Sequence, residues 1–114
     1  MQTQNILGAI AVADIERAIA WYSKLFGRKV DDRPMKEAAE WRLTQGGGVQ
    51  LVLDPTRAGR SMLTVGLGDL DEAIEETRTR GIELKRLDVT TGPYSLAQVA
   101  DPDGNVLTFA QPKK

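Results

Sequence analysis

The chain has 114 residues, of which 41% are hydrophobic and 27% charged, and its formal net charge is −1. This length supports one compact domain or two small halves that share a core, and the balanced charge gives no basic field for nucleic acid or an anionic membrane. The chain contains no cysteine and no histidine, which excludes disulfides, thiol or imidazole nucleophiles and metal sites that depend on those ligands.

The first element expected is a strand over Asn5 to Val12, a segment rich in Ile and Val. The apolar stretch from Ile6 to Ala13 is far too short to span a bilayer, and the polar residues before it do not resemble a signal peptide. We therefore expect a cytoplasmic protein with no membrane partner.

A helix follows in the first half of the chain. Asp14 has the chemistry of an N-cap and Gly27 the freedom to end the helix. Between them, one apolar stripe recurs at helical spacing: Ile15, Ala18, Ile19, Tyr22, Leu25 and Phe26. Three further strands are expected at Arg28 to Asp32, Glu40 to Thr44 and Val49 to Leu53, with the three glycines at 46–48 as a turn.

The second half repeats this order after a Pro- and Gly-containing linker at about 54–61. A strand is expected over Met62 to Leu67, then a helix capped by Asp69 and ended by Gly81, and a strand over Ile82 to Leu87. After a loop through residues 91–93, Ser95 to Val99 and Val106 to Phe109 form a hairpin around the turn at residues 101–105.

These two halves form an internal repeat. Residues 12–19 align with 67–74, and residues 46–51 align with 104–109. Neither half is large enough to bury its sheet alone. We therefore predict a single α+β domain over residues 1–114, with two tandem βαβββ modules at about 4–55 and 61–112. The modules are expected to form a curved mixed sheet with the helices on its convex side.

Period-two alternation assigns the residues of the concave sheet face. That face combines small residues with a few polar groups, as ligand cavities do, although an antiparallel sheet that shows its polar face to water has the same pattern. The residues assigned to it are Leu7, Ala9, Ala11, Glu40, Arg42, Gln50, Val52, Met62, Thr64, Gly66, Gln98, Ala100, Val106, Thr108 and Ala110.

The duplicated plan, the two similar helix starts and the Asp-Pro-Asp-Gly-Asn turn at residues 101–105 resemble the vicinal oxygen chelate superfamily. This superfamily includes glyoxalase I, extradiol dioxygenases and bleomycin resistance proteins. Its metal-dependent members place a His and a Glu from each half on a divalent ion. The corresponding positions here are Leu7, Gln50, Met62 and Thr108, a set without the charged or imidazole ligands that such an ion needs.

The resemblance therefore implies the metal-free branch, typified by bleomycin-resistance-type proteins that sequester a drug in a groove between two subunits. We expect a homodimer, a small-molecule ligand such as an antibiotic or another toxic compound, and no cofactor. Gln50, Thr64, Gln98 and Thr108 are candidates for orienting the ligand. Leu7, Trp41, Met62 and Tyr94 are candidates for apolar contact.

Two alternatives remain open at this stage. A metal-independent enzyme of the lyase or isomerase type could use Glu40 as a general base and Arg42 to stabilise an anion, but an exposed ion pair between these two residues explains them as well. In the other alternative, Leu7 and Met62 fill a collapsed cavity and the chain is a non-catalytic dimeric interaction module.

Overall fold

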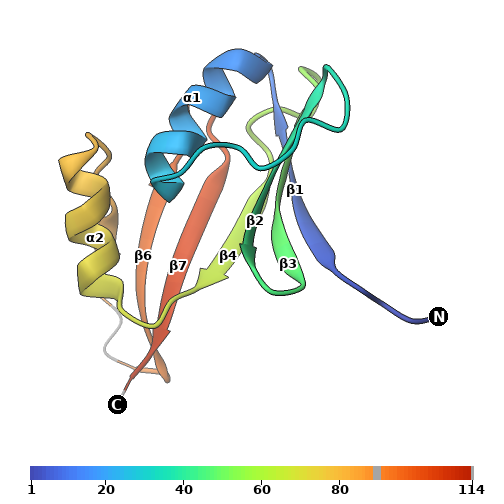
Figure 1. Cartoon of the computed structure of the whole chain (residues 1–114). Helices are drawn as coiled ribbons and strands as arrows, with labels where there is room; N and C mark the ends of the chain where they lie inside the picture. Colours follow the sequence, from blue (N-terminus) through green and yellow to red (C-terminus); the bar gives the residue numbers. More distant parts are fainter. Residues whose placement is uncertain (89–90, 114) are drawn as a thin grey trace.

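The computed structural model describes residues 1–88 and 91–113, so the predicted loop that runs from the strand ending at Leu87 through residues 91–93 lies partly outside the described residues, at Val89 and Thr90. Within these ranges the chain forms two helices and seven strands (Figure 1). In chain order they are β1 (Ile6–Val12), α1 (Ile15–Phe26), β2 (Ala38–Thr44), β3 (Gly47–Leu53), β4 (Met62–Gly66), α2 (Leu70–Thr79), β5 (Lys85–Leu87), β6 (Tyr94–Ala100) and β7 (Val106–Pro112). The α+β class and the plan of two βαβββ-like modules are confirmed.

Both helices begin at their predicted caps and α1 ends at the predicted Gly27, whereas α2 ends at Thr79 with Arg80 as its C-cap, one residue before Gly81. The carboxylate of Asp14 accepts the backbone N–H of Arg17 at 3.1 Å, and that of Asp69 accepts the N–H of Glu72 at 2.9 Å. Each bond satisfies one of the amide groups that the first helical turn leaves without a partner. Gly27 ends α1 with a φ of 68°, a left-handed conformation that glycine adopts without steric cost.

The strands make two sheets rather than one continuous sheet. Module 1 has the order β1-β3-β2 and module 2 has the order β4-β7-β6-β5, with β1 and β4 each parallel to its neighbour. The free edges β1 and β4 lie next to each other at Gly8, where an added Cβ would come within 2.6 Å of Leu63 Cδ1. No ladder of hydrogen bonds joins these two edges in the described part of the chain.

The predicted strand at Arg28 to Asp32 is wrong. Only an isolated bridge forms there, between Asp32 and Glu40. The side-chain carboxylate of Asp31 accepts the backbone N–H of Arg42 at 2.7 Å. A backbone carbonyl of this segment would accept that N–H if the segment paired with β2 as a regular strand. Pro34 follows two residues after the bridge and does not support a longer ladder.

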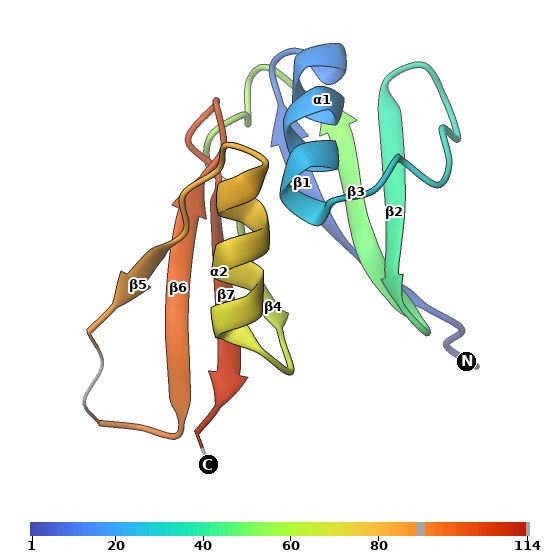
Figure 2. The same ribbon diagram turned by 60° about the vertical axis from the view of Figure 1, so that its left-hand side comes forward.

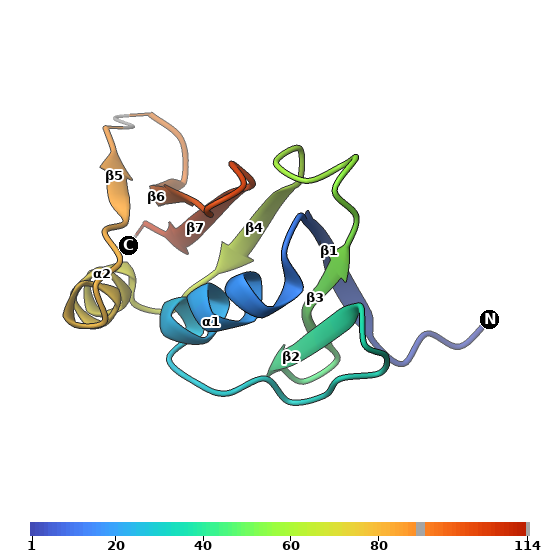
Figure 3. The ribbon, with the colours of Figure 1, turned by 90° about the horizontal axis from the view of Figure 1, so that it is seen from above.

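One hydrophobic core serves both modules. It includes Tyr22 and Leu25 from α1, Trp41 from β2, Leu107 and Phe109 from β7, all at most 5% exposed. The two helices contact each other, and α1 lies in the angle between the two sheets (Figures 2 and 3). Because the helix-covered faces of both sheets enclose the same core, their other faces lie on the outside of the molecule. We call these the open faces.

A buried carboxylate fixes the two modules to each other. Asp101, in the turn between β6 and β7, is 5% exposed. Its Oδ2 accepts the Tyr22 hydroxyl at 2.7 Å and the Asn105 side-chain amide at 2.8 Å, and its Oδ1 accepts the backbone N–H groups of Asp103 and Asn105. Asn105 also donates to the carbonyl of Ala11 in β1 at 2.8 Å. Burial raises the pKa of the Tyr22 phenol well above its ordinary value, and the hydrogen bond to Asp101 raises it further.

A second contact between the modules joins the ends of the two helices. The guanidinium of Arg80, just after α2, donates to the carbonyls of Lys24 and Leu25 in the last turn of α1. These carbonyls have no partner within the helix, and a cation is favourable at the negative end of the helix dipole. The orientation of the modules is therefore held at two places, the Asp101 cluster and the last turn of α1.

Candidate functional site

The strand registers place the open-face side chains in rows that run across each sheet. In module 1 the middle row is Ala9, Gln50 and Glu40, flanked by the rows Leu7–Gly48–Arg42 and Ala11–Val52–Ala38. In module 2 the middle row is Thr64, Thr108, Gln98 and Lys85, flanked by the rows Met62–Val106–Ala100 and Gly66–Ala110–Leu96–Leu87. The repeat thus sets a polar row in the middle of each open face.

The polar row of module 1 is acidic. The side-chain amide of Gln50 donates to Glu40 Oε2 at 2.9 Å. Arg42 pairs with Asp32, at 4.0 Å, and not with Glu40. The backbone N–H of Arg42, followed by the Arg28 guanidinium, lowers the pKa of Asp31. A small pocket of about 140 Å³ lies on this face beside Leu7, Glu40 and Arg42.

The pocket on the open face of module 2 is larger than the pocket of module 1, and the described residues that line it are uncharged. Gln98 donates its side-chain amide to Thr108 Oγ1 at 3.0 Å, the counterpart of the Gln50–Glu40 bond in module 1. A pocket of about 650 Å³ lies over this face, a volume typical of small-molecule sites. Its lining residues are Thr64, Gly66, Leu67, Tyr94, Leu96, Thr108, Ala110 and Pro112.

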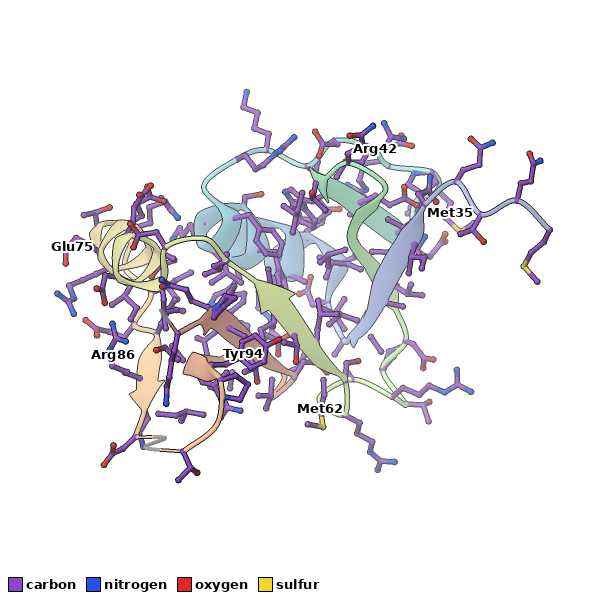
Figure 4. All side chains as sticks on the ribbon, turned by 90° about the horizontal axis from the view of Figure 1, so that it is seen from below. Met35, Arg42, Met62, Glu75, Arg86 and Tyr94 are labelled. Atoms are coloured by element: carbon purple, nitrogen blue, oxygen red, sulfur yellow. The ribbon has the colours of Figure 1, made fainter. Side chains whose placement is uncertain are left out.

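The ten candidate residues therefore fall into two groups and one exception. Leu7, Glu40, Arg42 and Gln50 share the open face of module 1. Met62, Thr64, Tyr94, Gln98 and Thr108 share that of module 2, where Met62 is 82% exposed at the outer row and Tyr94 is the first residue of β6. The labelled Met62 and Tyr94 can be found beside β4 and β6 in Figure 4.

Trp41 is the exception and does not belong to either open face. It is fully buried against Tyr22 and Phe26 of α1, and its indole N–H donates to the carbonyl of Arg28 at 3.2 Å. A ligand on the open face cannot reach it, which removes Trp41 from the candidate contacts. Leu96 and Pro112 also line the pocket, although neither is among the candidates predicted from the sequence. Leu96 could have been found, because it lies two residues before Gln98 and so shares its face.

The four positions that correspond to metal ligands in the resembling superfamily do not suit a metal. Leu7 and Met62 offer no hard donor, and Gln50 and Thr108 offer only neutral oxygens. Across residues 1–88 and 91–113, no group of three or more His, Cys, Asp or Glu side chains could hold an ion. A catalytic divalent ion does not fit these residues.

The comparisons with known proteins agree with this geometry. The profile of the glyoxalase-like domain matches residues 8–110, nearly the whole chain. The chain belongs to the glyoxalase-like domain family. The structure of a glyoxalase/bleomycin resistance protein from Catenulispora acidiphila is similar to this glyoxalase-like domain with a TM-score of 0.90 and 31% identity, covering 96% of this chain and 98% of that one.

Two further similar structures are those of proteins that bind antibiotics. A bleomycin-binding protein complexed with bleomycin has a TM-score of 0.73 and 19% identity, and covers 97% of this glyoxalase-like domain and 100% of its own chain. TnmS3, an antibiotic-binding protein from Streptomyces sp. CB03234, has a TM-score of 0.77 and 24% identity, covering 99% and 97% of the two chains. Among curated proteins, none has a significant sequence match to this domain.

As for membranes, neither α1 nor α2, the helices of the described residues, has the length and apolar character needed to cross a bilayer.

Proposed function

We propose that this glyoxalase-like domain is a metal-free small-molecule-binding protein of the cytoplasm, which sequesters an antibiotic or another toxic compound in a cavity between two copies of the chain. The observation that carries the proposal is the pocket on the open face of module 2. It combines apolar walls with a few hydroxyl groups, a composition that suits recognition of a ligand. Antibiotic binding by two structural neighbours, the bleomycin-binding protein and TnmS3, supports the same function.

The free sheet edges support the homodimer. β1 and β4 approach each other at Gly8 but share no ladder in the described residues, and the apolar side chains at their starts are exposed, Ile6 to 71% and Met62 to 82%. Such edges invite pairing with another strand unless they are covered. A second copy would cover them and bring the open face of one module opposite that of its partner.

Titration of the purified protein tests ligand binding. Calorimetry against a panel that includes bleomycin and aromatic antibiotics should show saturable binding of at least one compound, without stoichiometric zinc, nickel or iron in the protein. Thr64→Trp, which fills the pocket over β4, should abolish that binding. Thr56→Trp, on the exposed segment before β4, should leave it unchanged.

Two results would contradict the proposal. Stoichiometric bound metal would overturn the metal-free function, and the absence of any saturable response would overturn ligand binding. If the protein instead turns over a compound and Glu40→Gln abolishes the turnover without unfolding, the metal-independent enzyme would replace it.

Light scattering tests the dimer. The mass should be twice the 12.5 kDa of one chain. Met62→Arg, which places a charge at the edge of β4, should halve it. Met35→Arg is the matched control, because Met35 is also exposed, to 60%, but lies in the loop before β2 (Figure 4). A wild-type mass of one chain, or a dimer that survives Met62→Arg, would exclude this interface.

A further inference from the structure

The pocket on the open face of module 2 has a floor of small side chains and apolar sides. Its floor is made by small residues of the adjacent strands β4 and β7, namely Thr64, Gly66, Thr108 and Ala110. Larger side chains, including Leu96 and Tyr94 from β6, stand at its sides. Because the floor is one face of a sheet without bulky side chains, it fits a planar molecule better than a globular one.

Among the residues that the structure describes, no Asp, Glu, Lys or Arg lines this pocket. The nearest charged side chain in its rows is Lys85, which lies opposite Gln98 on the outermost strand and lines a separate pocket together with Glu83. A charged group that entered the neutral pocket would lose water without gaining a counter-charge, which is costly. The pocket therefore selects against charged ligands.

The hydrogen bond from Gln98 to Thr108 in the middle row determines which hydrogen-bonding groups the pocket presents to a ligand. Thr108 Oγ1 already accepts the amide of Gln98, so its hydroxyl proton is free to be donated. Neither Thr108 nor Thr64 donates its hydroxyl to another group among residues 1–88 and 91–113. The pocket thus presents hydroxyl donors, whereas the equivalent row of module 1 presents the acceptor oxygens of Glu40 and Gln50.

From these features, and resting on the proposed function, we propose that the part of the ligand bound by module 2 is an uncharged, planar, mainly apolar ring system that carries a carbonyl-type oxygen. Thr108 donates to that oxygen, the ring lies over Gly66 and Ala110, and Leu96 and Tyr94 contact its edges. Cationic glycopeptides are excluded from this pocket by the absence of acidic side chains.

Two tricyclic probes of the same skeleton test the class of ligand. The ketone 9-fluorenone and the hydrocarbon fluorene differ in the carbonyl group, while proflavine supplies a planar cation and bleomycin a cationic glycopeptide. Titrations of the isotope-labelled full chain, followed by NMR, should show saturable shifts at Thr64, Leu96, Thr108 and Ala110 with 9-fluorenone. Fluorene should bind about 3- to 10-fold more weakly, and the two cations should leave these signals unchanged.

A conservative variant isolates the hydroxyl. Thr108→Val keeps the shape of the side chain and removes its donor, so it should weaken 9-fluorenone binding about 3- to 10-fold and leave fluorene binding unchanged. Thr56→Val is the control with the same chemical change on an exposed segment outside the pocket, and it should change neither affinity.

The outcomes separate this inference from the proposed function. If a cation binds at these residues and 9-fluorenone does not, the ligand class is wrong while ligand binding stands. If 9-fluorenone and fluorene bind equally, or Thr108→Val affects both alike, the carbonyl contact is wrong. Failure of every probe, together with failure of the antibiotic panel, would overturn both proposals.

Discussion

At the scale of single residues, Asp101 decides how the two modules meet. It is one of the few buried charged or polar residues of the chain, and four donors converge on its two oxygens. One of these donors, Tyr22, belongs to module 1, and Asn105 extends the cluster to β1. A buried carboxylate is stable only when its hydrogen-bonding capacity is satisfied in this way.

Asp101→Asn should therefore destabilise the fold strongly. The amide keeps the shape of the carboxylate but replaces one acceptor oxygen with an NH₂ group that faces other donors. We expect a loss of about 3 kcal/mol in the free energy of unfolding, measured by urea denaturation. Asp88→Asn, the same change at an exposed position, should cost less than about 0.5 kcal/mol. Equal effects of the two substitutions would show that the cluster does not hold the modules together.

The raised pKa of Tyr22 predicts a pH dependence at the alkaline end. The phenol titrates near pH 10 in the unfolded chain and higher in the folded one, so its contribution to stability is complete below about pH 10 and is lost as the pH rises above that value. The wild type should lose up to about 1.4 kcal/mol per pH unit more than Tyr22→Phe in this range. Urea unfolding between pH 9 and 11 measures the difference. Parallel profiles for the two proteins would contradict the assigned pKa shift.

At the scale of elements, the backbones of β2 and β3 come close together at Gly48. A Cβ on Gly48 would lie 2.1 Å from the backbone oxygen of Trp41, next to the irregularity between Arg42 and Thr44. Backbone atoms at the centre of a sheet cannot move aside as a flexible side chain can. The glycine is therefore required here by contact with the neighbouring strand.

Gly48→Ala should cost about 2 kcal/mol or more in the free energy of unfolding, because the added methyl group forces β2 and β3 apart. Gly66→Ala is the matched control, since nothing lies within 4 Å of the Cβ that would be added there. It should change stability by less than about 0.5 kcal/mol. Thermal and urea denaturation of both variants measure this, and a harmless Gly48→Ala would refute the close contact.

Local signals were sufficient for most elements and failed at one. Helix ends depend on a few neighbouring residues, here the caps at Asp14 and Asp69 and the glycines that follow the helices, so both helices could be predicted. The segment from Arg28 to Asp32 has ordinary strand composition, but Asp31 uses its side chain to bind the Arg42 amide. Competition between side chain and backbone for the same donor depends on tertiary geometry, which composition does not contain.

The candidate site was predictable in its rows but not in its assembly. The repeat and the two-residue alternation assigned Glu40, Gln50, Gln98 and Thr108 to one face of the sheets. The structure joins them as two hydrogen-bonded pairs, Gln50 with Glu40 and Gln98 with Thr108. They did not show that the two open faces lie on the outside of a shared core. That arrangement depends on Asp101 and Arg80, whose partners are far away in the sequence.

At the scale of the whole molecule, the shared core predicts cooperative unfolding. Both tryptophans, Trp21 and Trp41, belong to module 1 and pack into or against this core, whereas far-ultraviolet circular dichroism reports on the strands and helices of both modules. The two signals should show coincident transitions in urea, as expected for two-state unfolding. A fluorescence transition that occurs at a different urea concentration from the dichroism transition would show that the modules unfold independently.

The position of the open faces has an evolutionary consequence. Side chains of the open faces such as Thr64, Gln98 and Thr108 lie outside the core, so replacing them costs little stability. Selection can therefore alter what this surface recognises while the residues that maintain the fold stay unchanged. A fold in which different residues bind the ligand and maintain stability can acquire new ligands through a few substitutions, without first becoming more stable.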